Sequence, residues 1–273
     1  MPFFRRPALF NFAFHAPGLW LQRVAGRAQP EPWGRDKKVL ELYLRSNFEL
    51  AKAQGKVYEN RESGVAFFRA GHLMNITADP LWLVYERNNR DEPFWKLKDV
   101  TVGDVPVPGE DASRYSISYD PPAFDRSWSL YFYQDRLDHM LKQRRNKERL
   151  EHVFNGIFGS TGYNEHVVFR AVYAELELQR KQEAVLPQWY QNDYQFLMPL
   201  FLTQSDKVDL TAALRPEPAL RRYSVRTLLF PTFAYAYARS VVKNRASFAD
   251  WIMLSEEELE SIVVEEDEDA QQA

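Results

Sequence analysis

The chain has 273 residues, a formal net charge of −3 and no cysteine. Hydrophobic residues make up 45% and charged residues 27% of it, which is typical of a globular protein and excludes a disordered one. A protein that coats nucleic acid would be strongly basic, so any nucleic-acid contact here must be local. Without cysteine there is no disulfide, no thiolate metal site and no cysteine nucleophile. The composition fits a cytoplasmic protein, although other compartments also permit it.

The first residues, MPFFRRPALFNFAFHAPGLWL, place two arginines before an apolar stretch. A signal peptide has this order, but Pro7, Asn11, His15 and Pro17 interrupt the stretch and no small-residue cleavage site follows. We therefore expect the segment to pack against the core. No stretch of the chain reaches the roughly 18 uninterrupted apolar residues of a membrane span, so no membrane contact is expected.

The first half of the chain predicts one long helix followed by strands. Apolar side chains form a stripe along 37–54, with Asp36 as the expected N-cap and Gly55 as the C-terminal stop. A hairpin and two further strands are expected at 56–71, 81–88 and 94–102, before a loop at 105–113. The stretch 103–120 is the weakest seam in the chain.

The second half predicts two helices, then strands, then a last helix. A helical pattern begins at Leu130 and stops at 142–149, KQRRNKER, which has no apolar residue. The segment AVLPQWYQNDYQFLMPLFL is apolar on both sides in its second half, which indicates a strand buried on both faces, while its PQWY part is expected to form a turn. Further elements are a helix at 163–184, strands at 209–215 and 222–230, and a helix at 233–242 that Thr232 caps.

Together these elements predict an α+β fold, with a mainly antiparallel sheet and helices at both ends and between the strands. No Pro-, Gly- or Ser-rich linker divides the chain, so one domain is expected over 1–255. The acidic residues of 256–273 are expected to form a disordered tail.

No diagnostic catalytic motif is present: the chain has no phosphate-binding loop, dinucleotide fingerprint, nucleophile elbow or zinc-protease helix. Its five histidines are scattered, whereas metal sites need three or four converging ligands, so no metal and no cofactor are expected.

Three segments carry residue types that suit a base and a phosphate. Arg144 and Arg149 lie in the basic run and match phosphate oxygens, or they form a solvated face. Gln188 and Tyr190 offer hydrogen bonds and a stacking face, or they belong to a turn that satisfies its own backbone. Tyr235 and Arg239 share a helix face at i, i+4, either as a ring with a cation for a ligand or as a pair packed on a strand.

The order of several segments resembles a known family. They are FNFAF at 10–14, DHMLKQRRNKERL with His139 and Arg149, AVLPQWY with Gln188 and Tyr190, QFLMPLFL, DLTAAL, TLLFPTFAYAYAR with Thr227, Tyr235 and Arg239, and DWI at 250–252. This series resembles an uncharacterised, mostly bacterial and fungal domain family that is found beside OST-HTH (LOTUS) or cold-shock domains. The resemblance implies association with RNA and names no reaction.

Two departures from the family pattern stand out. Ala236 and Tyr237 occupy the places of two asparagines, and AGHL at 70–73 replaces N-T-G-L. If those asparagines act on a substrate, this chain has a changed activity or none.

Two functions remain open. The first is an RNA- or nucleotide-directed module in which the PQWY turn, Arg226, Tyr235 and Arg239 hold a base and a phosphate. If it is an enzyme, RNA processing with His139 as general acid or base is the expected class. The second is a non-catalytic protein-interaction or scaffold domain of a phage or defence system, which would copurify with a protein partner. The sequence does not decide whether the protein is catalytic.

Overall fold

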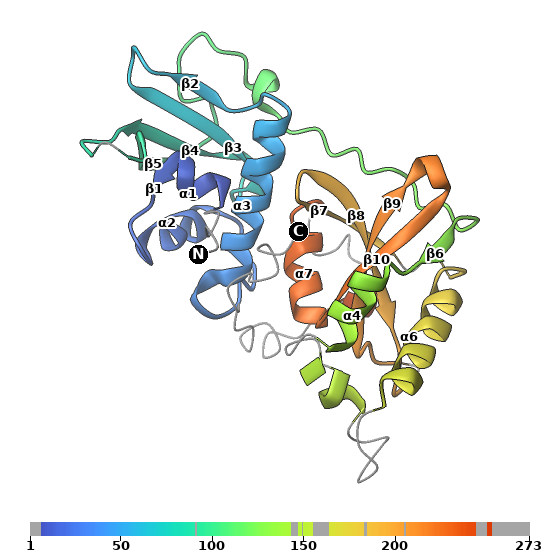
Figure 1. The fold of residues 1–273 in the computed structure, drawn as a ribbon. Helices are drawn as coiled ribbons and strands as arrows, with labels where there is room; N and C mark the ends of the chain where they lie inside the picture. Colours follow the sequence, from blue (N-terminus) through green and yellow to red (C-terminus); the bar gives the residue numbers. More distant parts are fainter. Residues whose placement is uncertain are drawn as a thin grey trace. The chain divides into compact units, whose positions relative to one another are not determined.

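The computed structural model describes residues 7–90, 92–142, 147–148, 150–154, 164–182, 185–204, 206–243 and 250–252. The chain divides between Tyr119 and Asp120 into two compact units, each with its own sheet (Figure 1). The boundary falls in the stretch that the sequence marks as its weakest seam. The expectation of one domain over 1–255 stays a prediction, and the acidic tail lies outside the described residues.

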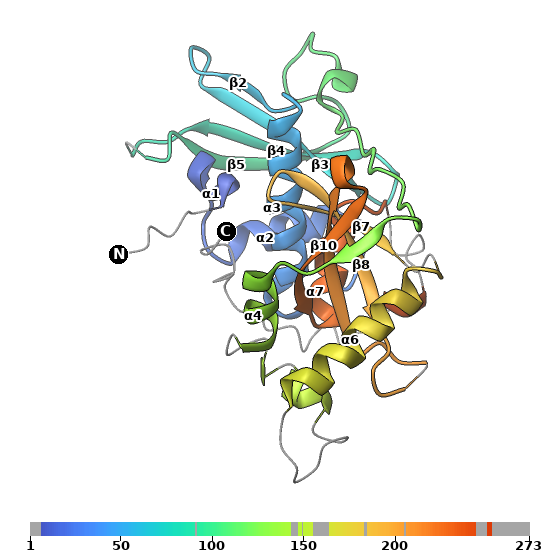
Figure 2. The same ribbon diagram turned by 45° about the vertical axis from the view of Figure 1, so that its right-hand side comes forward.

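The first unit has a curved sheet in the order β1–β5–β4–β3–β2. Neighbouring strands are antiparallel except for the short β1, which pairs with β5 in parallel. Helices cover one face of this sheet (Figure 2). Its elements are α1 Ala8–Phe12, β1 Ala13–Phe14, α2 Leu19–Arg27, α3 Lys38–Ala53, β2 Tyr58–Asn60, β3 Val65–Met74, β4 Pro80–Arg87 and β5 Trp95–Val102.

Helix α3 confirms the helix predicted from the apolar stripe, and its C-terminal end is as expected. Gly55 has φ +65°, its N–H donates to the carbonyl of Lys52, and the N–H of Lys56 donates to the carbonyl of Ala51 at 2.7 Å. These two bonds form a Schellman motif, which satisfies carbonyls that the helix leaves unpaired. The predicted cap at the other end is wrong: Asp36 has φ 52° and no side chain caps the helix.

The N-terminal segment packs against this unit as expected. Leu9 is fully buried and Phe12 contacts Phe48 with 4.9 Å between ring centroids. His15 is also buried, where its Nδ1–H donates to the Ala13 carbonyl at 3.0 Å and its Nε2 accepts from the Tyr85 hydroxyl at 3.3 Å. Burial lowers the pKa of His15 to about 4, because it outweighs the hydrogen bond to the Ala13 carbonyl, which acts to raise that pKa.

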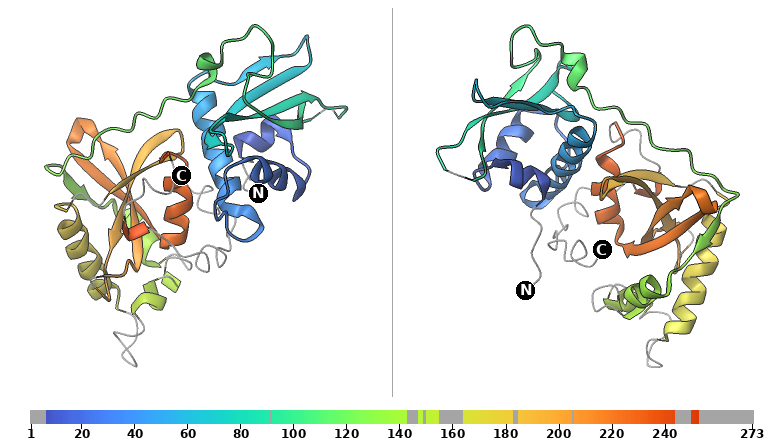
Figure 3. Two further views of the ribbon diagram at one scale, coloured as in Figure 1. Left: turned by 180° about the vertical axis from the view of Figure 1, so that it is seen from behind. Right: turned by 45° about the horizontal axis from the view of Figure 1, so that its top comes forward.

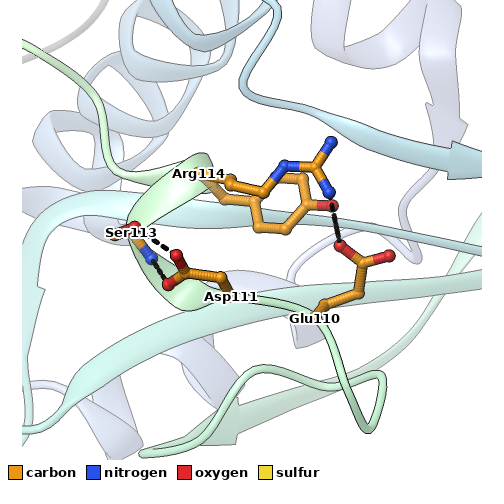
Figure 4. A network of polar contacts seen from close by, with 5 residues as sticks. Glu110, Asp111, Ser113 and Arg114 are labelled. Atoms are coloured by element: carbon orange, nitrogen blue, oxygen red, sulfur yellow. Dashed lines mark hydrogen bonds and ion pairs between the residues drawn. The ribbon is translucent and has the colours of Figure 1, made fainter.

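The segment after β5 covers the other face of the first sheet through Tyr115, which packs with Phe67, Trp82 and Val84. The Tyr115 hydroxyl donates to the Glu110 carboxylate at 2.6 Å, and Arg114 pairs with the same carboxylate at 3.2 Å (Figure 4). Asp111 accepts from the N–H of Ser113 and caps a short 3-10 helix, Ala112–Tyr115. Burial and the Glu110 bond raise the pKa of Tyr115 to about 12, so the phenol stays protonated and anchors the segment.

The second unit has a sheet in the order β6–β10–β9–β8–β7, with only the β6–β10 pair parallel. Helix α6 packs on one face of the sheet and α7 on the other (Figure 3). Its elements are β6 Ser129–Tyr131, α4 Gln134–Lys142, α6 Glu165–Gln179, β7 Leu186–Tyr190, β8 Asp193–Leu200, β9 Leu210–Glu217, β10 Arg222–Leu229 and α7 Pro231–Arg239. The two sheets confirm the predicted α+β class with mainly antiparallel strands.

Three local predictions in this unit are wrong. The chain at Leu130 is strand β6, because Ser129, Leu130 and Tyr131 pair with the edge of β10, and the helix begins only at Gln134. The PQWY segment is strand β7, because the turn lies after it at Gln191 and Asn192, both with positive φ. Helix α7 begins with Pro231 at its first position, and no side chain caps it.

No helix within the described ranges is both long and apolar enough to cross a membrane.

The buried His15 predicts an acid-sensitive first unit. The pKa of His15 in the folded protein is about 4, below the ordinary 6.5. The stability that neutral His15 contributes to the fold is therefore fully present above pH 6.5 and is lost as the pH falls toward 4. The loss amounts to about 3 kcal/mol at most. Urea unfolding should show that the free energy of unfolding falls more between pH 7 and pH 5 in the wild type than in the variant His15→Phe. The variant His166→Gln, at an exposed position, should lose as much stability as the wild type. An equal change of the free energy of unfolding with pH in all three proteins would contradict the prediction.

We expect position 71 in β3 to tolerate no residue larger than glycine. Gly71 has φ +59°, and a Cβ there would lie under 3.0 Å from oxygens of Tyr43, Asn47 and Tyr119. Gly71→Ala should lower the free energy of unfolding by about 3 kcal/mol, through backbone strain and overlap. The matched variant Gly103→Ala has φ +90° and open space around it, so it should lose only about 1 kcal/mol. If urea unfolding shows equal losses of free energy of unfolding in the two variants, the three oxygens move aside for the Cβ without destabilising the fold, and the prediction is wrong.

Candidate functional site

The second sheet has two chemically different faces. One belongs to the core: Leu210, Ala212 and Leu214 of β9 pack with residues of β8, β10 and α6. Because side chains alternate along a strand, Ala213, Arg215 and Glu217 lie on the opposite face. The core face holds apolar residues from four strands, whereas the opposite face is mixed and holds Gln188, Gln195, Thr211, Arg215, Glu217, Arg222 and Ser224. Any polar chemistry of this unit therefore belongs to the face that α7 partly covers.

Arg226 is an extra residue in strand β10. The β9–β10 register pairs Val225 with Leu214 and then Thr227 with Ala213, so Arg226 has no partner in the ladder. Such a bulge locally redirects a side chain. It leaves the Arg226 side chain half-buried and outside the core.

Two further arginines lie near Arg226, one from β9 and one from α4. The positive charges of Arg136 and Arg215 both act on the Arg226 guanidinium. Each of these two has a carboxylate of its own, since the Arg136 Nε lies 3.6 Å from Asp135 and the Arg215 Nε lies 3.3 Å from Asp193. We call Arg136, Arg215 and Arg226 the arginine cluster.

Arg226 is the member of the cluster that no carboxylate of the described residues pairs. Among the described residues it makes no hydrogen bond and no ion pair. Burial first, then Arg136 and Arg215, lower the pKa of Arg226, and Asp135 and Glu217 oppose this more weakly. An arginine nevertheless stays protonated in a protein, so a half-buried positive charge remains without a bonded partner among the described residues. The guanidinium fork suits an oxyanion with two adjacent oxygens, such as a phosphate.

A separate network beside the cluster is fully paired. Arg222 donates through Nε to the Glu217 carboxylate at 2.7 Å and through Nη2 to the Tyr133 hydroxyl at 2.7 Å, and Tyr133 donates to Glu217 at 3.1 Å. Burial acts to raise the pKa of Glu217, but the bonds from Arg222, Ser224 and Tyr133 outweigh it and the pKa is lowered. The Glu217 bond raises the pKa of Arg222. Arg222 is thus engaged by Glu217 and Tyr133 within this network.

Gln188 and Tyr190 lie in β7, at positions that face the same side as Arg215. Gln188 is 2% exposed and donates to Gln195 at 3.4 Å, while its own Oε1 is buried with no partner among the described residues. Tyr190 is half-buried and meets Tyr237 of α7 edge-on, with 5.6 Å between centroids. The structure thus places Gln188 inside the unit and Tyr190 against α7.

Tyr235 and Arg239 share a face of α7, and that face is turned inward. Their exposed fractions are 0% and 3%, and the Arg239 Nη1 donates to the Val242 carbonyl at 3.1 Å. In this conformation both side chains pack inside the unit, whereas Arg226 reaches solvent. The role predicted for Tyr235 and Arg239 in binding stays a prediction.

The remaining predicted residues are not placed in detail. His139 lies in α4, three residues after Arg136, but its side chain is outside the described part of the chain, as are Arg144 and Arg149. Their roles stay predictions. Within the residues that the structure describes, no three histidines or carboxylates gather into a possible metal site.

A family model described as a domain of unknown function (DUF3825) matches residues 24–248, which include the whole arginine cluster. The chain belongs to the DUF3825 family. No curated protein and no solved structure matches this DUF3825 chain. The expected membership of an uncharacterised family is confirmed, and the match does not extend to OST-HTH or cold-shock domains.

Sequence reasoning named Arg226 in the DUF3825 chain but missed Arg136 and Arg215. Arg215 ends a predicted strand, DLTAALR, and its place opposite the apolar residues follows from alternation once the strand is accepted. Arg136 carries no comparable signal, because its position depends on where α4 begins and on how α4 meets β10.

The uncompensated charge predicts that Arg226 costs stability. Arg226→Met keeps an unbranched stem about as long as the aliphatic part of arginine and removes the charge, so it should raise the free energy of unfolding by up to about 1 kcal/mol in phosphate-free buffer. Arg170→Met, at an exposed position of α6, should change it little. Urea unfolding measures both. A loss of stability in Arg226→Met would mean that the guanidinium supports the fold.

Proposed function

We propose that this DUF3825 protein is an RNA- or nucleotide-directed module whose second unit binds a phosphate at Arg226. The observation that carries the proposal is the half-buried guanidinium that makes no hydrogen bond or ion pair with any described residue. Proteins usually pair such a charge, and a bound anion would pair it here. A phosphate between Arg226, Arg215 and Arg136 would be held by groups from β10, β9 and α4.

The choice of an RNA or nucleotide over a simple anion has further support. Tyr131 of β6 and Tyr133 just after it lie against Arg222, on the same strand β10 as Arg226. Aromatic rings beside arginines suit a base and its phosphate together. The family that the sequence resembles is expected beside OST-HTH and cold-shock domains, which also favours RNA, and a cytoplasmic location fits the absence of cysteine.

Binding is the part of the proposal that the geometry supports. An RNA-processing reaction with His139 as acid or base remains a separate prediction, since a catalytic role needs that side chain within reach of the substrate. The alternative, a scaffold domain with a protein partner, draws on Val167, Tyr173 and Leu178, which are exposed on α6. Single exposed apolar residues are ordinary on monomers, so they support it less than Arg226 supports an anion.

The test is a binding measurement on the full chain. Fluorescence anisotropy with a labelled ten-nucleotide oligouridylate at low salt should show binding by the wild type and a loss of about tenfold in Arg226→Ala, because a charge-assisted hydrogen bond contributes roughly 1.5–3 kcal/mol. The affinity should also fall as the salt concentration rises, and the slope of log affinity against log salt concentration should be smaller in Arg226→Ala than in the wild type.

Arg170→Ala is the matched control, since it removes the same charge from α6 on the other face of the sheet. It should bind as the wild type does. Equal affinities in Arg226→Ala and the wild type would refute the proposal. A wild type that binds no RNA or nucleotide and copurifies with one protein would favour the scaffold alternative.

A further inference from the structure

An exposed aromatic ring lies on the strand next to β10, the strand that carries Arg226. Tyr131, in the edge strand β6, is 40% exposed. The register pairs Tyr131 with Ser224 of β10, two residues before Arg226. Neighbouring strands are about 4.8 Å apart and two residues span about 6.6 Å, so regular strands would place the Cα atoms of Tyr131 and Arg226 about 8 Å apart. Two long side chains at this separation can contact the base and the phosphate of one nucleotide.

The Tyr131 ring is also held in place. The Arg222 guanidinium carbon lies 3.9 Å from its centroid, and Tyr133 packs edge-on at 4.8 Å. Arg222 cannot easily leave, because it donates one hydrogen bond to Glu217 and one to Tyr133, and Tyr133 in turn donates to Glu217. An exposed ring with fixed orientation loses little conformational entropy when a flat ligand stacks on it. Glu217 and Tyr133 therefore act as positioning residues for Tyr131.

We infer that Tyr131 stacks on an unpaired base whose phosphate lies at Arg226, so that the ligand is a single-stranded nucleic acid or a nucleotide and not a duplex. The inference rests on the proposed function and names its substrate class. A base within a duplex is already stacked on both sides, whereas an unpaired base is free to stack on a protein ring. Stacking accepts any base, so little sequence preference is expected.

The experiment compares four variants on two probes. The probes are a labelled ten-nucleotide oligouridylate and a ten-unit chain with the same phosphates and no bases, and a blunt RNA duplex of equal length serves as a third ligand. Wild type should bind the oligouridylate about tenfold more tightly than the other two, because a stacked base contributes roughly 1–3 kcal/mol. Tyr131→Ala should lose this preference and still bind the chain without bases as the wild type does. Tyr131→Phe keeps the ring and should keep the preference.

Tyr173→Ala is the matched control, because Tyr173 is 41% exposed on α6, the helix that packs on the opposite face of the sheet from α7 (Figure 3). It should behave as the wild type. Arg226→Ala should weaken both single-stranded probes equally and so separates the two proposals. If Arg226→Ala weakens binding but Tyr131→Ala does not, phosphate is bound and stacking on Tyr131 is refuted. If neither variant weakens binding, the proposed function itself fails. Tighter binding of the duplex would also refute the inference.

Discussion

The register shift between Val225 and Thr227 decides which side chains of β10 face the core. Tyr223, Val225 and Leu228 all belong to the core cluster, although strict alternation would put Tyr223, Val225 and Thr227 there instead. One extra residue at Arg226 resolves this conflict, since it returns Leu228 to the core. The threonine is thereby paired with Ala213 on the polar face, and the arginine is left without a ladder partner. The charge chemistry of the second unit follows from that one interruption.

The consequence is a local imbalance of charge. Among the described residues, Arg136 and Arg215 each have a carboxylate and Arg222 has Glu217, whereas Arg226 forms no ion pair. A protein that needed only stability would replace such a group by an apolar one. An unpaired guanidinium that still reaches solvent is instead what a site for an anion requires. The same residue is thus expected to oppose folding and to favour binding, as functional groups commonly do.

The sequence predicted the elements better than the site, and particular residues show why. Periodicity and Gly55 located α3, and the hairpins of the first sheet followed from turn residues. Three-residue β6 was missed because so short a strand exists only through its pairing with β10. Tyr235 and Arg239 were correctly placed on one face of a helix, but spacing along a helix does not say whether that face points inward.

The arginine cluster was beyond prediction for a related reason. Arg136, Arg215 and Arg226 come from three elements and are separated by up to 90 positions, so only the packing of α4 beside β10 brings their charges together. The bulge itself leaves a trace in the sequence, because apolar residues at 223, 225 and 228 break the period of two. That trace identifies an irregular strand and does not identify its partners.

The net charge of −3 limits how this site can bind a polyanion. Beyond a Debye length of about 8 Å the charges of the chain are largely screened and do not attract RNA, so only short-range contacts contribute. A few phosphate contacts give a shallow dependence on salt, in contrast to the steep one of basic nucleic-acid coats. At physiological salt these contacts weaken while stacking does not. The larger share of the affinity should therefore come from the ring of Tyr131, and the arginine cluster should mainly determine where the strand lies on the sheet.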